Sequence, residues 1–400
     1  MKLTQIVKVE GDYEILDNLA KITNGLYNSA LYESSQRYKR EQKFYFYYDL
    51  CNILKNNTLY TLLPSQTAQA VLQKVEGAIK SFLKLRRNNA NAAYPKYHKK
   101  NTTWVIPFKS QQIKIDGNIL TVPMSMKYRE EKGLSHIDLK IPNMRYDGIV
   151  KYIELYKTDR WYASIVIDVK EQQESVPKGN LYIDLGVRNL ATVFDGKKVA
   201  IYSGGKTSST NRYRNKKNAE QQAILSTIGK KTSKEKRRIA RKALHQLKQQ
   251  LHSMTKSIVQ KAKAENKGIV VGNLSHVRDS ANYNDNANQK IHQWQFAEIT
   301  KQLFYKAKEF GIKITKISEE DTSKTCALCG QETNGRVHRG LYRCKLYSKQ
   351  FNADANGALN IMKRYLQIPL QQGSGRVVGV LAHPAVYRWN EYRWCNDAND

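Results

Sequence analysis

The sequence predicts a multidomain α/β protein, because its 400 residues exceed one small core and its periodicity changes twice along the chain. Apolar residues recur at helical spacing before about residue 97 and alternate with a period of two after about residue 100. From Gly179 a third pattern begins, an apolar strand that carries one acid. These patterns predict a helical segment inserted in a small antiparallel β-barrel, followed by a larger α/β domain.

The N-terminal region alternates as a short strand from Leu3 to Val9 and then becomes helical. Residues 13–54 predict one or two helices, and residues 65–87 predict another. The polar face of this last helix consists of Gln66, Gln69, Gln73, Lys80 and Lys84. Two interpretations stay open for this face: a surface that binds nucleic acid, or an ordinary solvated helix face.

The segment from about residue 100 to 170 predicts short strands. Asp116-Gly117 is typical of a hairpin turn between two of them, and residues 150–156 and 161–169 flank a turn at Thr158-Asp159-Arg160. We expect these strands to form a small antiparallel barrel that the N-terminal strand joins.

The third region begins with an apolar strand, residues 181–187, in which Asp184 is the one acid. A second strand follows at residues 190–194, as at the start of a ribonuclease H-like sheet. Further strands are expected at residues 268–271 and 312–317, with a helix at about 294–310 between them. We assign no secondary structure after Ile361.

The charge balance favours a polyanionic partner. Sixty-seven Lys and Arg against 35 Asp and Glu give a formal charge of +32. The densest basic stretch lies between Lys206 and Lys248 and predicts an amphipathic helix pair on a phosphate backbone, with a solvated helix as the alternative. Its candidate nucleic-acid-binding residues are Arg212, Arg214, Lys230, Lys231, Lys236, Arg237, Arg238 and Arg241.

No apolar run reaches the length of a bilayer span, and the N-terminus has no apolar signal segment. We therefore expect a cytoplasmic, nucleoid-associated prokaryotic protein with no membrane partner and no small-molecule substrate.

Three of the five cysteines lie close together in the sequence, which favours a metal site over disulfides. Cys326 and Cys329 form one half of a zinc knuckle, but the second half supplies only Cys344, with Tyr347 at the fourth position. Either zinc is held by three cysteines with His338 or water, or the knuckle is metal-free. Both interpretations stay open.

The order of three motifs is specific. The strand with Asp184 is followed by Thr-Ser-Lys-Thr-Cys-Ala-Leu-Cys-Gly at residues 322–330 and by Asp-Ala-Asn-Gly-Ala-Leu-Asn-Ile at residues 354–361. This order resembles TnpB, the transposon-encoded RNA-guided nuclease from which type V CRISPR effectors descend. The resemblance implies a wedge barrel (1–10 and 98–178), a helical recognition domain (11–97), a RuvC domain of ribonuclease H fold (179–320 and 350–370), a degenerate zinc-finger insertion (321–349) and a C-terminal tail (371–400).

In that family, a RuvC site uses three carboxylates to hold two Mg²⁺ ions. The resemblance places the first at Asp184 and the third at Asp354. The second is expected after the strand 268–271, where this chain has Gly272, and Asn273 faces the other side of the strand. We therefore expect weak or absent magnesium and no nuclease activity, unless Asp279, Glu319 or Glu320 fills the gap.

The expected function is RNA-guided DNA binding without cleavage, most like nuclease-dead TnpB-like repressors of transcription. Its partners are then a guide RNA and double-stranded DNA with a short target-adjacent motif. Two alternatives stay open: an active RNA-guided endonuclease with a displaced carboxylate, and a decayed transposon protein that binds nucleic acid nonspecifically.

Overall fold

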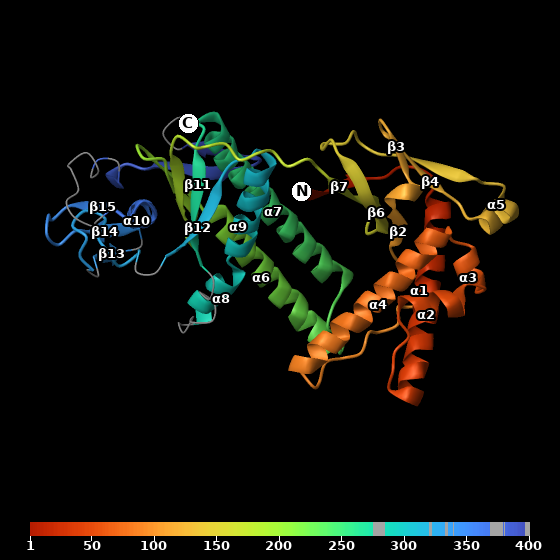
Figure 1. Cartoon of the computed structure of the whole chain (residues 1–400). Coiled ribbons are helices and arrows are strands. Elements are labelled where there is room, and N and C mark those ends of the chain that lie inside the picture. The colour runs from red at the N-terminus through yellow and green to blue at the C-terminus, as the bar shows by residue number, and fades with distance from the viewer. Residues whose placement is uncertain are drawn as a thin grey trace. The chain divides into compact units, whose positions relative to one another are not determined.

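The computed structural model describes residues 1–274, 285–319, 322–332, 335–338, 340–368, 379 and 381–396, without the side chains of residues 285–287 and 338. The chain divides into two compact units, Met1–Lys170 and Glu171–Asp400. Figure 1 shows the elements of both, coloured along the chain.

The longer helices of the first unit follow the predicted periodicity, whereas two short helices, at residues 58–61 and 126–132, were not predicted. The first helix starts where the side chain of Asp12 accepts hydrogen bonds from the backbone N–H groups of Glu14 and Ile15, and it ends at Gln42 in the left-handed conformation. That ending splits the predicted region 13–54 into two helices. The helices are α1 (Tyr13–Glu41), α2 (Tyr47–Leu54), α3 (Thr58–Thr61), α4 (Ser65–Asn88) and α5 (Met126–Lys132).

Two antiparallel sheets accompany these helices. One has the order β1-β7-β6-β2 and the other β3-β4-β5, and the N-terminal strand β1 pairs with β7 as expected. Closure into a wedge barrel stays a prediction. The strands are β1 (Lys2–Lys8), β2 (Ile106–Lys109), β3 (Lys114–Asp116), β4 (Ile119–Pro123), β5 (His136–Lys140), β6 (Ile149–Lys157) and β7 (Trp161–Asp168), with a 3₁₀ turn η1 (Ser110–Gln112).

A seven-stranded mixed sheet organises the second unit, with the order β12-β11-β8-β9-β10-β16-β17. Strands β8, β11 and β12 run parallel, whereas β9 is antiparallel to both β8 and β10. The strands are β8 (Asn180–Asp184), β9 (Asn189–Phe194), β10 (Val199–Ser203), β11 (Gly268–Asn273), β12 (Ile314–Ser318), β16 (Ala385–Asn390) and β17 (Arg393–Asn396).

Strands β16 and β17 correct the expectation that the region after Ile361 has no secondary structure. Val386 pairs with Ile201 of β10, and Trp389 pairs with Trp394 across the hairpin. The aromatic residues of this segment therefore take part in the sheet, although their short run gave no clear period.

Helices cover both faces of the sheet. Ile183 and Val271 pack with α7 and α9, whereas Tyr182 and Val270 pack on the side of α10 and the cysteine segment. This alternation decides which side chains at the strand ends share a face. The remaining elements are α6 (Gly205–Thr227), α7 (Lys234–Ala264), α8 (Asp285–Gln293), α9 (Phe296–Glu309), β13 (Arg336–His338), β14 (Leu341–Arg343), β15 (Gln350–Asn352) and α10 (Ala353–Leu366).

Candidate functional site

Asp184 ends strand β8 and faces α10. It lies one residue beyond Ile183, which points to the opposite core, so the alternation directs its carboxylate to the face of Tyr182. Helix α10 meets this carboxylate at Gly357, where an added β-carbon would lie 2.7 Å from Oδ2 of Asp184. Gly357 therefore gives the helix room to approach the acid, which accounts for the glycine in the motif at residues 354–361.

Gly272 lies on the same face as Asp184, and the carboxylate of Glu319 fills the space beside it. Val270, two residues earlier in β11, packs in the α10 core, so Gly272 faces that side too. A β-carbon built on Gly272 would lie 1.5 Å from Oε1 and 2.3 Å from Cγ of Glu319. The expectation of an empty second-carboxylate position is therefore wrong: an acid from the neighbouring strand lies there, and only glycine leaves room for it.

The parallel pairing of β11 and β12 brings Glu319 to this place. Gly272 pairs with Ile317 and Asn273 with Ser318, so Glu319 follows directly at the end of the neighbouring strand. Thr322 fixes the backbone there, because its N–H and hydroxyl donate to the carbonyl oxygen of Glu319 at 3.1 and 2.8 Å. Asp279 and Glu320, the other acids considered for this role, lie outside the described residues.

Asp184 and Glu319 are buried acids, and the pKa values of both are raised. Burial, followed by the charges of Glu319 and Asp354, raises the pKa of Asp184 well above its ordinary value, although Arg336 acts against this shift. Burial raises the pKa of Glu319 to about 7. Oε1 of Glu319 is buried and has no hydrogen-bond partner among the described residues. Two buried like charges and an unsatisfied oxygen fit a bound cation.

Asp354 is the third acid and lies in the first turn of α10. The side chain of Asn352 accepts hydrogen bonds from the N–H groups of Asp354 and Ala355 and so begins the helix. Both oxygens of Asp354 are engaged: Asn189 Nδ2 donates to Oδ2 at 2.6 Å, and Arg336 Nη2 donates to Oδ1 at 2.8 Å. The sequence predicted the acid and its helix, but not these two partners.

Two buried asparagines join α10 to the cysteine segment. Asn356 accepts from the N–H of Ala327 and donates to the carbonyl of Thr325, both at 2.8 Å. Asn360 donates to the carbonyls of Thr322 and Thr325 at 2.8 and 2.7 Å. These bonds explain why the two sequence motifs occur together, since the asparagines of one hold the backbone of the other beside the acids.

The sulfur atoms of Cys326, Cys329 and Cys344 lie within 4.8 Å of one another, a grouping that fits a zinc ion. Burial raises the pKa of Cys326 to about 12, despite N–H groups of Cys329 and Leu328 that act against it. The Tyr347 side chain is 45% exposed, and its backbone N–H donates to Cys344. The side chain of His338 lies outside the described residues, so both predicted forms of the knuckle stay predictions.

The predicted basic helix pair forms, as α6 and α7. Arg212, Lys230, Lys231, Arg237 and Arg241 are exposed, in keeping with a surface for phosphates. The other three predicted residues are less free: Arg214 is half-buried, Lys236 bonds to Gln222, and Arg238 pairs with Glu235 at 2.7 Å.

The polar face of α4 is only partly open. Gln66 is half-buried and donates to Oε1 of Gln111 at 3.1 Å, and Gln69 bonds to Tyr60. Lys80 pairs with Glu76 at 2.5 Å, whereas Gln73 and Lys84 are exposed. Gln66 and Gln69 thus contribute to the packing of the first unit, and nucleic-acid binding by this face stays a prediction.

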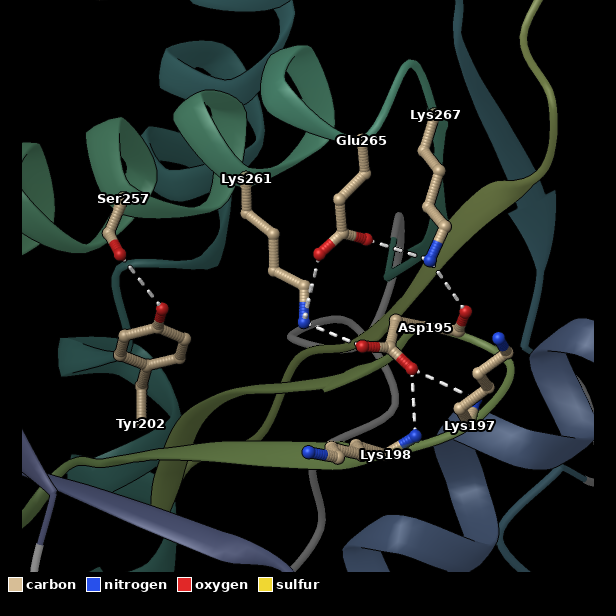
Figure 2. A network of polar contacts seen from close by, with 8 residues as sticks. All are labelled: Asp195, Lys197, Lys198, Tyr202, Ser257, Lys261, Glu265 and Lys267. Carbon is tan, nitrogen blue, oxygen red and sulfur yellow. Dashed lines mark hydrogen bonds and ion pairs between the residues drawn. The ribbon is translucent and has the colours of Figure 1, made fainter.

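Another acid of this unit, Asp195, has a different environment (Figure 2). It lies in the turn between β9 and β10 and accepts from the N–H groups of Lys197 and Lys198 and from Nζ of Lys261 at 2.6 Å. Burial would raise the pKa of Asp195, but these donors outweigh it and hold the pKa below its ordinary value. Asp195 therefore has the properties of a structural acid.

Comparison with known proteins supports the resemblance seen in the sequence. Residues 164–278 match the OrfB_IS605 family model, described as "Probable transposase", and residues 296–361 match the model "Cas12f1-like, TNB domain". A solved structure of a Cas12f1–sgRNA–target DNA complex is similar to 87% of this chain and 82% of that chain, with a TM-score of 0.61 and 19% identity. The chain is thus a mixed α/β multidomain protein whose fold is similar to that of this Cas12f1 structure.

Three curated relatives are similar to this chain in sequence. A protein of Escherichia coli (strain K12) named "Putative RNA-guided DNA endonuclease InsQ" is 26% identical over 84% of this chain and 85% of its own length. The TnpB-like protein ORF457 of Acidianus two-tailed virus is 25% identical over 89% of this chain and 84% of its own. The Cas12f1 endodeoxyribonuclease of Sulfoacidibacillus thermotolerans is 31% identical over 28% of this chain and 25% of its own. The chain is thus similar to InsQ and to a TnpB-like protein over most of its length.

These relatives correct the expectation that the chain is no enzyme. InsQ, Cas12f1 and Cas12f2 are all named endonucleases or endodeoxyribonucleases, so the family points to nuclease activity. The expectation relied on the glycine at position 272, and Glu319 removes that reason.

One further finding concerns membranes: within the described residues, no helix combines the length and apolarity that a bilayer crossing requires.

Proposed function

We propose that the chain is an active RNA-guided DNA endonuclease with a rearranged RuvC site, in which Asp184, Glu319 and Asp354 are the three acids. The observation that carries this proposal is the Glu319 carboxylate beside Gly272, on the face of Asp184. Burying one carboxylate beside another costs free energy that a solvent-exposed carboxylate avoids. A functional role for Glu319 explains why this cost is retained.

The carboxylates of Asp184, Glu319 and Asp354 are the kind of ligand that magnesium prefers, although within the described residues only the three cysteines bring three ligand atoms within 4.8 Å of one another. Asp184 and Glu319 supply buried oxygen ligands of like charge, and Glu319 keeps one oxygen unbonded within the described residues. Asn189 orients Asp354 through a 2.6 Å hydrogen bond. The chemistry that bound magnesium supplies at such a site is activation of a water and stabilisation of charge on the phosphodiester. The earlier expectation of weak magnesium depended on a missing acid.

The remaining surfaces suit the nucleic acids that such an enzyme holds. The exposed cations of α6 and α7 would contact the phosphates of a guide RNA or its heteroduplex. Gln73 and Lys84 of α4 would approach the target-adjacent motif in double-stranded DNA. We expect the protein in the cytoplasm with the nucleoid.

Cleavage by the purified ribonucleoprotein tests the proposal. With Mg²⁺ and a matched DNA target, we expect double-strand cleavage that Asp184→Ala abolishes. Asp116→Ala, an exposed acid of the first unit, is the control and should leave cleavage intact. Binding without cleavage would overturn the proposal and favour the repressor.

Sequencing of the RNA that copurifies with the protein tests whether a guide RNA directs it to DNA. A defined RNA species with one variable end supports it. A random mixture would favour the decayed transposon protein that binds nucleic acid nonspecifically.

A further inference from the structure

The third acid already holds a cation that belongs to the protein. Nη2 of Arg336 lies 2.8 Å from Oδ1 of Asp354, and the side chain of Arg336 is 53% exposed whereas that of Asp354 is 14% exposed. Since Asn189 bonds the other oxygen, both oxygens of Asp354 are in use. A divalent ion bound to Oδ1 would share that oxygen with the guanidinium, and the two positive charges would repel each other at close range.

Arg336 comes from a different part of the chain than the acids. It begins β13, whose hairpin with β14 carries a register shift between Arg336 and His338. The hairpin lies within the region that matches the TNB domain model. The position of this hairpin consequently decides whether a positive charge lies on Asp354.

Arg336 also affects the first acid. Its positive charge favours the ionised form of Asp184, against burial and the charges of Glu319 and Asp354. One guanidinium thus stabilises two of the acids in the absence of metal, as a divalent ion would.

We propose that Arg336 is a placeholder cation that competes with the divalent metal for Asp354 and so sets the metal concentration that the site requires. This inference depends on the proposed metal site. Arg336 contacts a ligand of that site, so it is a positioning residue. Arg336 and the metal compete for the same carboxylate, and such coupling is reciprocal. The factor by which bound metal weakens the Arg336–Asp354 ion pair is therefore also the factor by which removal of Arg336 strengthens metal binding.

Titration of the full-length, nucleic-acid-free protein with MnCl₂, followed by the electron paramagnetic resonance signal of free Mn²⁺, tests the proposal. We expect Arg336→Gln to bind Mn²⁺ about fivefold more tightly than the unchanged protein, the size of a partly exposed ion pair. Arg343→Gln, an exposed arginine of the same hairpin, is the matched control and should change nothing. Arg336→Lys keeps the charge and should give an intermediate affinity.

A second background isolates the ion pair. When Asp354→Asn is already present, Arg336→Gln should no longer change the affinity for Mn²⁺. Equal Mn²⁺ binding in Arg336→Gln and the unchanged protein, with equal unfolding temperatures and with loss of binding in Asp184→Ala, overturns the role of Arg336 but leaves the metal site intact. Absence of Mn²⁺ binding in every variant overturns both.

Discussion

Asp195 and the pair Asp184–Glu319 belong to the same unit but differ in how their charges are balanced. Asp195 accepts from Lys261 and from two backbone N–H groups, and its pKa is lowered. Asp184 and Glu319 face each other's charge, their pKa values are raised, and one oxygen of Glu319 has no partner in the described residues. The comparison teaches that a satisfied acid supports the fold, whereas unsatisfied acids that share a space indicate a bound cation.

The largest effect should come from removing the carboxylate of Glu319 and then restoring an acid at position 272. Glu319→Ala should reduce cleavage at saturating Mg²⁺ by about 10²-fold or more, because a metal-bound nucleophile loses its alignment. The double variant Gly272→Glu with Glu319→Ala places the acid on β11 and should recover part of the rate. The measurement is single-turnover cleavage of a matched target.

Gly272→Glu alone sharpens this experiment. The added side chain would collide with Glu319 and add a third charge to the pair, so we expect it to be less active than the double variant. If the double variant is no better than Glu319→Ala, Glu319 does not substitute for an acid at position 272.

Removal of the charge from Asp195 should affect stability but not chemistry. Asp195→Asn leaves Lys261 with only its longer contact of 3.7 Å to Glu265 and should lower the free energy of unfolding by about 2 kcal/mol, the value of a hydrogen bond to a charged group. Chemical denaturation measures this loss. Asp116→Asn, an exposed acid that also precedes a turn glycine, is the matched control and should cost little. Cleavage by Asp195→Asn below its unfolding temperature should stay normal.

The pH dependence of stability should have opposite signs for the two regions. The pKa of Glu319 is raised from 4.5 to about 7, so between these values the folded state holds a proton that the unfolded state lacks. Stability of the metal-free protein should therefore fall as the pH rises from 5 to 8, by up to about 3 kcal/mol from this group. Mg²⁺ should reduce the loss, and Glu319→Gln should flatten the slope.

Asp195 should contribute a pH dependence of stability of the opposite sign. Its folded pKa lies below the ordinary 3.8, so its stabilising contribution is present at neutral pH and is lost only as the pH falls below that value. A Glu319→Gln protein that still loses stability between pH 5 and 8 as steeply as the unchanged chain would contradict the assignment to Glu319.

The smallest effect should come from the outer part of the Asp195 network. Ser257 and the hydroxyl of Tyr202 share one hydrogen bond of 3.2 Å (Figure 2). Ser257→Ala should lower the free energy of unfolding by about 1 kcal/mol, since only one neutral hydrogen bond is lost. A loss as large as that of Asp195→Asn would show that the hydroxyl pair, rather than the charge, stabilises this region.

The order of the motifs, through the resemblance to TnpB, predicted two of the three proposed acids. Asp184 ends a continuous apolar strand, and Asp354 follows an N-capping Asn352 at the start of a helix. Apolar periodicity placed α1, α2 and α4 of the first unit and the basic pair α6 and α7, but it did not predict the short helices α3 and α5. Periodicity failed for β16 and β17, because β16 pairs with β10, a strand far earlier in the chain, and β17 pairs with β16.

The sequence by itself determined the order of the motifs, the cysteine cluster and the acids at positions 184 and 354. Only the tertiary structure decided that Glu319 lies beside Gly272 and that Arg336 lies on Asp354. The physical reason is that these pairs are made by sheet register and by a hairpin returning to a helix. Such contacts between distant residues leave no periodicity in either partner segment.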